Sequence, residues 1–140
     1  MFLIHTTCIL FGAKSCVDCA SDWSEFRQSC YKLIIINKNW IDAESHCVEQ
    51  GGHLASVRSD QEKDFILSLV HSGWFWIGGN DRENEKEWVW SDGSDFDYSL
   101  WHKGQPNNWN NDENCLLFTE EKKWNDGGCN GTRQFVCKIA

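Results

Sequence analysis

Two stretches of the chain place apolar residues at the three- and four-residue spacing of an amphipathic helix. The first extends from Asn39 to about Glu49 and is followed by Gly51-Gly52, a pair that commonly ends a helix. One face of this segment consists of Trp40, Ala43, Glu44 and Cys47. We expect this face to pack against the rest of the protein.

The second helix is predicted to begin at Ser59. Ser59 and Glu62 have the spacing of a capping box, in which each side chain accepts a hydrogen bond from the backbone N–H of the other residue. Gly73 ends the segment, and its buried stripe consists of Phe65, Ile66, Leu69 and Val70.

Short apolar or alternating segments indicate β-strands. They extend from Ser29 to Ile36, Phe75 to Gly78, Trp88 to Trp90, Asn114 to Thr119 and Gln134 to Lys138. Two helices with several short strands predict an α+β fold. The periodicity fails between Ser91 and Asp112, and irregular loops of this length in compact domains are usually functional or disordered.

The charge of the chain limits its partners. A net charge of −8, with no Lys/Arg-rich run, removes the attraction to phosphate that supports binding to nucleic acid or to anionic membranes. Cations and neutral ligands are better candidates. Nine tryptophans supply large buried rings or surfaces on which sugars stack, and composition does not separate these two uses.

Eight cysteines indicate an oxidising compartment. The one CxxC spacing, Cys16 to Cys19, has no second pair or nearby histidine to complete a zinc site. An apolar run from Phe2 to Phe11, followed by Ala13-Lys14-Ser15, predicts a signal peptide over residues 1–15 and a mature secreted domain over residues 16–140. No later segment is apolar enough for a membrane anchor.

Oxygen-bearing side chains are concentrated in the loop that ends at Glu113. Calcium prefers six to eight oxygen ligands from carboxylates, amides, carbonyls and water. On composition alone, however, loops rich in Asn and Asp are mostly solvated turns. The loop contains Gln105, Asn107, Asn108, Asn110, Asn111, Asp112 and Glu113, with Asn125 and Asp126 following.

Several separate motifs, taken together with the order of the cysteines, resemble the C-type lectin domain in its long form. The resemblance covers Cys19 to Lys138 and implies a disulfide-stapled fold with two helices, small antiparallel sheets and a long calcium-binding loop. The motifs are Trp76-Ile77-Gly78-Gly79, Gln105-Pro106-Asn107, Glu113 two residues before Cys115, and Trp124-Asn125-Asp126 just before Cys129.

The resemblance also implies roles for single residues. Pro106 should follow a cis peptide bond. Two adjacent sugar hydroxyls should complete the calcium shell, while a ring at Trp109 packs against the sugar, as in galactose-type members; the alternative is that Trp109 packs on its own loop. The residues that match the calcium ligands are Gln105, Asn107, Glu113, Asn125 and Asp126, and those that match the sugar ligands are Gln105, Asn107, Trp109, Glu113 and Asn125.

The central tripeptide departs from both common versions of the family motif. Mannose-type members carry Glu-Pro-Asn and galactose-type members carry Gln-Pro-Asp, whereas this chain has Gln-Pro-Asn. Only two of the five implied ligands, Glu113 and Asp126, are carboxylates. We therefore expect calcium affinity in about the sub-millimolar to millimolar range of extracellular modules. Trp109 favours galactose.

The resemblance implies further sites. A candidate second metal site comprises Asp81, Glu85 and Asn108, with a contribution from Glu113; the alternative is a solvated acidic loop.

Cys8 would leave with the signal peptide, so Cys16 would either link two chains in a homodimer or remain a free or capped thiol. Asn130 lies in a glycosylation sequon. The implied disulfides are Cys19–Cys30, Cys47–Cys137 and Cys115–Cys129.

The sequence thus predicts a secreted, calcium-dependent lectin, galactose-leaning, that recognises microbial or glycoconjugate surfaces in innate immunity and looks similar to secreted fish lectins. No nucleophile has a plausible base, which argues against an enzyme. Type II antifreeze-like members of this fold bind ice, but only four threonines are present, two of them in the predicted signal. Other members bind proteins without calcium, and these usually lose several ligand positions that are kept here.

Overall fold

The computed structural model describes residues 4–5 and 17–140. Residues 4–5 form the short strand β1 (Ile4–His5), which pairs antiparallel with β2 (Val17–Asp18). Cys8, Cys16 and the cleavage point after Ser15 lie outside the described residues. No helix in the described part of the chain is long and apolar enough to cross a membrane.

Helix α1 (Trp40–Glu49) begins where the sequence predicts. The Asn39 side chain caps it by accepting a hydrogen bond from the Asp42 backbone N–H at 2.8 Å. Trp40 and Cys47 are buried on the expected face. Glu44, also assigned to that face, instead accepts hydrogen bonds from the Leu54 backbone at 2.9 Å and from a serine hydroxyl, so it holds neighbouring strands to the helix.

Helix α2 (Asp60–Leu69) is capped by Ser59, whose Oγ accepts from the Glu62 backbone N–H at 3.0 Å. The reciprocal half of the capping box is shifted by one residue, because Glu62 Oε1 accepts from the Arg58 backbone N–H at 2.9 Å. The helix ends one residue earlier than its apolar stripe, and Val70 has an extended backbone.

The remaining strands form one mixed sheet of eight strands, in the order β3-β4-β10-β6-β8-β9, with β5 on β10 and β7 on β6. The resemblance implied small antiparallel sheets; the pairing of β10 with β6 is parallel and joins them into one. The strands are β3 (Ser24–Phe26), β4 (Ser29–Lys38), β5 (His53–Leu54), β6 (Phe75–Asn80), β7 (Val89–Trp90), β8 (Cys115–Phe118), β9 (Trp124–Gly127) and β10 (Arg133–Ile139).

Close packing explains the glycines of β6. A Cβ atom on Gly78 would lie 2.6 Å from the Leu54 backbone oxygen, and one on Gly79 would lie 2.5 Å from the Leu116 side chain. Every residue of β6 is buried, because neighbouring segments cover both faces. Strand β9 was not predicted, because its Asn, Asp and Gly disfavour strands; pairing with β8 overrides that preference.

Most of the tryptophans have a structural role. Trp40, Trp76 and Trp124 are fully buried. The Trp124 ring packs edge-on against Trp90 and Trp101, with ring centroids 5.5 and 5.7 Å apart. Trp124 is therefore a core residue, and it anchors the long irregular segment to the sheet.

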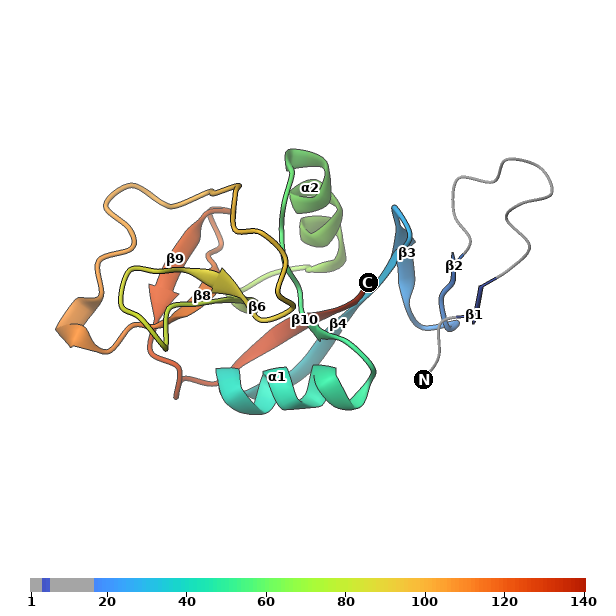
Figure 1. Ribbon diagram of the computed structural model, residues 1–140, viewed down its shortest axis with the longest axis horizontal. Helices are drawn as coiled ribbons and strands as arrows, with labels where there is room; N and C mark the ends of the chain where they lie inside the picture. The colour runs from blue at the N-terminus through green and yellow to red at the C-terminus, as the bar shows by residue number, and fades with distance from the viewer. Residues whose placement is uncertain (1–3, 6–16) are drawn as a thin grey trace.

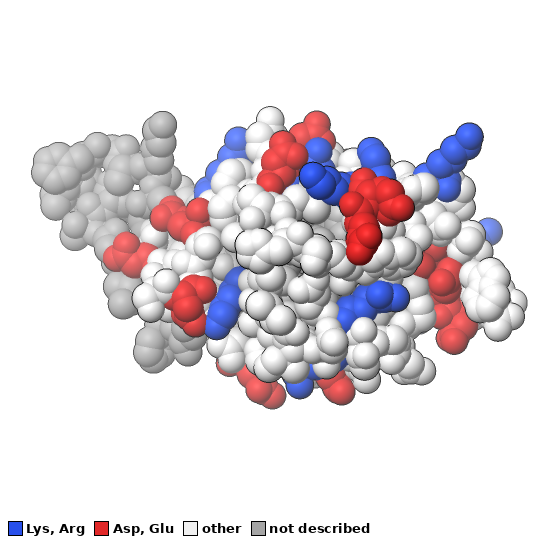
Figure 2. All heavy atoms as spheres, turned by 180° about the vertical axis from the view of Figure 1, so that it is seen from behind, with Lys and Arg blue, Asp and Glu red and all other residues white. Residues whose placement is uncertain are grey.

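The two helices lie on opposite sides of the strands β4 and β10, and the loop that precedes β8 projects at the end of the molecule away from β2 and β3 (Figure 1). Acidic and basic side chains are interspersed on the face opposite to this view, without a continuous field of one sign (Figure 2). The implied disulfides are formed: Cys19–Cys30, Cys47–Cys137 and Cys115–Cys129.

Candidate functional site

A hollow of about 290 Å³ lies between the irregular loop and strand β9. Strand β9 contributes Asn125 and Asp126, which its register sets opposite Leu117 and Leu116 of β8. The Cys115–Cys129 disulfide ties β8 to the segment after β9. All five residues that match the family's calcium ligands line this hollow: Gln105, Asn107, Glu113, Asn125 and Asp126.

Asp126 holds the loop against the sheet. Its carboxylate accepts hydrogen bonds from two successive backbone N–H groups, those of Asn107 at 3.1 Å and Asn108 at 2.6 Å. The Asp126 residue is almost fully buried. The Gln105–Pro106 peptide bond is cis, as the resemblance implied. The position of the Gln105-Pro106-Asn107 tripeptide therefore depends on the Asp126 carboxylate.

The backbone of Trp109 joins two other side chains of the site. Its N–H group donates to Asn107 Oδ1 at 3.2 Å and to Glu113 Oε1 at 3.0 Å. The Trp109 residue is 68% exposed. Its indole therefore offers a flat apolar surface beside the hollow.

The asparagines of the loop have two different roles. Asn108, Asn110 and Asn111 adopt left-handed backbone conformations, with φ of 44°, 61° and 54°. Asparagine tolerates this conformation better than other non-glycine residues. Asn108 also accepts the Glu113 backbone N–H at 3.0 Å with Oδ1. These three residues shape the turn, whereas Asn107 lines the hollow.

Two oxygens of the hollow have no hydrogen-bond partner within the described part of the chain. They are Gln105 Oε1 and Asn125 Oδ1, and both are buried. A buried polar atom without a partner costs about 1–3 kcal/mol, so a ligand that bonds these two atoms would offset that cost. Since both atoms are amide oxygens, the missing partner is a donor or a cation. Together with the two carboxylates, this oxygen set fits calcium.

The two carboxylates make the hollow acidic. Burial raises the pKa of Glu113 from its ordinary value, and the charges of Asp126 and Asp112 raise it further, while the Trp109 backbone N–H opposes the shift. Across the described residues, no three His, Cys, Asp or Glu side chains are grouped as a metal site. A metal in this hollow would therefore need the amide oxygens as well as the two carboxylates.

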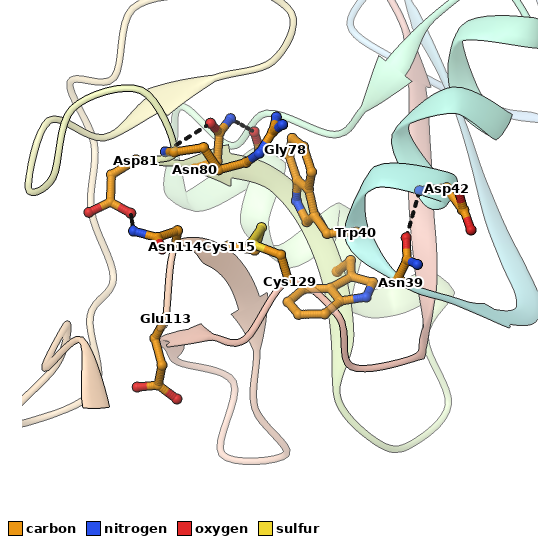
Figure 3. Close-up of a disulfide and its surroundings, with 12 residues drawn as sticks. Asn39, Trp40, Asp42, Gly78, Asn80, Asp81, Glu113, Asn114, Cys115 and Cys129 are labelled. Carbon is orange, nitrogen blue, oxygen red and sulfur yellow. Dashed lines mark hydrogen bonds between the residues drawn. A yellow bond between two sulfur atoms is a disulfide. The ribbon is translucent and has the colours of Figure 1, made fainter. Parts of the chain in front are cut away.

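The candidate second site has a different arrangement. The Asn114 side-chain nitrogen donates to Asp81 Oδ1 and to Glu85 Oε1, both at 2.9 Å, so an N–H donor joins the two carboxyl groups. Figure 3 shows Asn114 directed toward Asp81, while the Glu113 side chain points away from them. Partial desolvation raises the pKa of Glu85, with Asp81 adding to the shift. Asn108 bonds elsewhere, with Glu113 and Asp126.

Two residues of the hollow were missed by sequence reasoning. Trp74 precedes β6 and Arg133 begins β10, and both contribute to the lining. Neither belongs to a motif of the resemblance. The feature that sets Trp74 apart is its exposure beside a buried strand, and exposure cannot be read from the sequence.

The fold, the cysteine pairing and this hollow agree with a match to a known family. The family model described as the Lectin C-type domain matches residues 36–139. The chain belongs to the C-type lectin domain family. Ladderlectin from Oncorhynchus mykiss is 40% identical over 125 residues, which is 84% of this chain and 66% of that protein.

Two solved structures have the same C-type lectin fold. A calcium-independent type II antifreeze protein is 33% identical with a TM-score of 0.84, covering 88% of this chain and 95% of that one. The cow CD23 carbohydrate-recognition domain, determined in the presence of a GlcNAc2Man3 oligosaccharide, is 34% identical with a TM-score of 0.83, covering 86% and 95%. Domains of this family bind carbohydrates and are not enzymes, so the C-type lectin domain of this chain is a binding module.

Proposed function

We propose that this C-type lectin domain is a secreted lectin that binds galactose-type sugars through a calcium ion held in the hollow. The observation that carries the proposal is the pair of buried, unpartnered amide oxygens, Gln105 Oε1 and Asn125 Oδ1, which line the hollow together with two carboxylates. The partners are microbial or host glycoconjugates in extracellular fluid.

The residues that would hold calcium are Gln105, Asn107, Glu113, Asn125 and Asp126. When bound, the ion supplies direct coordination to two adjacent hydroxyls of the sugar. The amide nitrogens of Gln105, Asn107 and Asn125 are the hydrogen-bond donors for those hydroxyls, and the Glu113 carboxylate is an acceptor. Asp126 keeps the tripeptide in position, because its carboxylate accepts the backbone N–H groups of Asn107, the last residue of the tripeptide, and of Asn108, the residue after it.

Galactose is favoured over mannose by the exposed indole of Trp109. The apolar face of galactose can stack on an aromatic ring, and this ring is open to a ligand beside the hollow. A glycan array in calcium tests the choice. Galactose-terminated glycans should give the strongest signals, and a strong preference for mannose would overturn the sugar assignment.

Substituting Trp109→Ala separates stacking from metal binding. The backbone N–H that bonds Asn107 and Glu113 is retained, so the calcium dissociation constant should stay within about two-fold of wild type. Galactose affinity should fall by ~2- to 12-fold, since an aromatic stacking contact contributes about 0.5–1.5 kcal/mol. Both constants are measured by titration calorimetry. Unchanged galactose affinity would assign the ring no part in sugar binding.

We further propose that the Asp81 loop holds no calcium, because the Asn114 amide already joins its carboxyl groups. The substitution Asn114→Asp replaces this donor with a third carboxylate. It should lower stability in calcium-free buffer through like-charge repulsion and raise the calcium stoichiometry from one to two. Calorimetry of wild type and variant provides the comparison, and two equivalents in wild type would contradict the proposal.

Ice binding is the second candidate function, favoured by the structural similarity to the antifreeze protein. Within the described residues, one of the two threonines, Thr119, is buried, which leaves only Thr132 at the surface. This is a poor basis for an ice-matching surface. Thermal hysteresis above a matched lectin control would favour ice binding, and sugar-independent capture that survives chelation would favour a protein-binding role.

We also propose three modifications of the chain. Residues 1–15 are removed as a signal peptide, Asn130 is glycosylated, and Cys16 links two chains in a disulfide-bonded dimer. Asn130 is exposed in the turn between β9 and β10. Intact mass before and after deglycosylation, and gels with and without reductant, test these modifications.

A further inference from the structure

Arg133 lies at the edge of the hollow in an unusual environment. Its guanidinium carbon is 5.2 Å from the ring centroid of Trp74 and 5.6 Å from that of Trp76. Trp76 is fully buried, whereas Trp74 is 38% exposed. The two rings therefore hold the cationic side chain beside the hollow, with one ring available to solvent and to a ligand.

The guanidinium group has no acidic partner in the part of the chain that the structure describes. Among the described residues, Arg133 takes part in no ion pair or side-chain hydrogen bond, and its Nε is buried without an acceptor. By contrast, Arg58 pairs with Asp97 at 3.1 Å and lies near Asp95. Burial lowers the pKa of Arg133, which nevertheless stays charged at neutral pH. Burying an N–H donor of a charged group without an acceptor costs free energy, so an anionic partner is expected for Arg133.

The net charge of the hollow with calcium bound also favours an anionic partner for Arg133. The lining contains two acidic residues, Glu113 and Asp126, and one basic residue, Arg133. If calcium binds as proposed above, the two carboxylates balance the charge of the ion. The charge of Arg133 then remains without compensation in the lining of the same hollow.

We propose that Arg133, held by Trp74, forms an anion subsite next to the calcium position and binds the sulfate or carboxylate group of an acidic saccharide. The planar guanidinium group matches both oxyanions through paired N–H donors. This inference rests on the proposed function and makes acidic galactosides the preferred ligands of the same site.

The test compares a neutral galactoside with its acidic derivatives. The probes are methyl β-galactoside, its 2-sulfate, its 6-sulfate and the methyl glycoside of galacturonic acid, all with the 3,4-diol free. We expect at least one acidic probe to bind wild type about ten-fold or more tightly than the neutral probe. Whether a sulfate or the uronic acid is preferred identifies the source of the oxyanion.

The substitution Arg133→Gln should reduce this ratio to about one, and Arg133→Lys should retain part of it because the charge remains without the planar fork. Arg27→Gln is the matched control, since Arg27 also stacks on an aromatic ring, 5.1 Å from that of Phe26, outside the hollow. The control should keep the full ratio. Calcium binding of each variant reports whether the site is folded.

The outcomes separate this inference from the proposed function. If wild type binds no galactoside in calcium, the proposed function fails. If it binds the neutral probe but prefers none of the acidic probes, or if the preference survives Arg133→Gln, the anion subsite is wrong and the lectin function stands.

Discussion

Replacing Asp126 with asparagine is expected to weaken calcium binding by at least about 100-fold and to remove calcium-dependent retention on galactose resin. The substitution removes one of only two negative charges in the hollow. It also puts an amide nitrogen where a carboxylate oxygen accepts a backbone N–H, so either Asn107 or Asn108 loses its partner. Calorimetric calcium titration measures the first effect.

Asp112→Asn is the matched control for this experiment. Asp112 belongs to the same loop and undergoes the same change of charge, but its side chain is exposed and does not line the hollow. We expect its calcium dissociation constant to stay within about three-fold of wild type, because exposed charges are screened. If Asp126→Asn weakens calcium no more than this control, Asp126 is not a ligand.

The second large effect concerns stability. Lys138 Nζ lies 2.6 Å from Glu62 Oε2, and both side chains are nearly buried. Tyr31 also donates to this carboxylate, and its pKa is raised by burial and by this bond. Lys138→Met leaves the carboxylate with no cation, so the free energy of unfolding should fall by about 3–5 kcal/mol. Denaturant titration measures this loss.

Lys32→Met provides the comparison. Lys32 and Asp22 are also 2.6 Å apart, but the side chains are 32% and 61% exposed. Solvent screens this pair, and its removal should cost less than about 1 kcal/mol. Similar losses for the two variants would mean that burial does not govern the strength of these pairs.

The local features of the fold were predictable because they depend on neighbouring residues. Asn39 and Ser59 cap their helices where the pattern predicts, since a cap is made within three residues. Glu62 was recognised only as a capping residue. Its partner Lys138 lies 76 residues away, and no local pattern reveals such a contact.

The candidate site was predictable as far as its motif extends. The resemblance identified Gln105, Glu113 and the other three residues that now line one hollow. It could not identify Trp74 or Arg133, because their place depends on the parallel pairing of β10 with β6. The composition of the loop alone could not separate Asn107 from the asparagines that shape the turn, since their left-handed backbone is seen only in the structure.

The most direct test of the calcium-mediated mechanism is the titration of galactose into the wild-type protein at saturating calcium and after chelation. The calcium-mediated mechanism predicts about one galactose per chain in calcium, no detectable binding with chelator, and tighter calcium binding when galactose is saturating, by the factor by which calcium tightens galactose binding. Galactose binding that persists unchanged under chelation would contradict this mechanism.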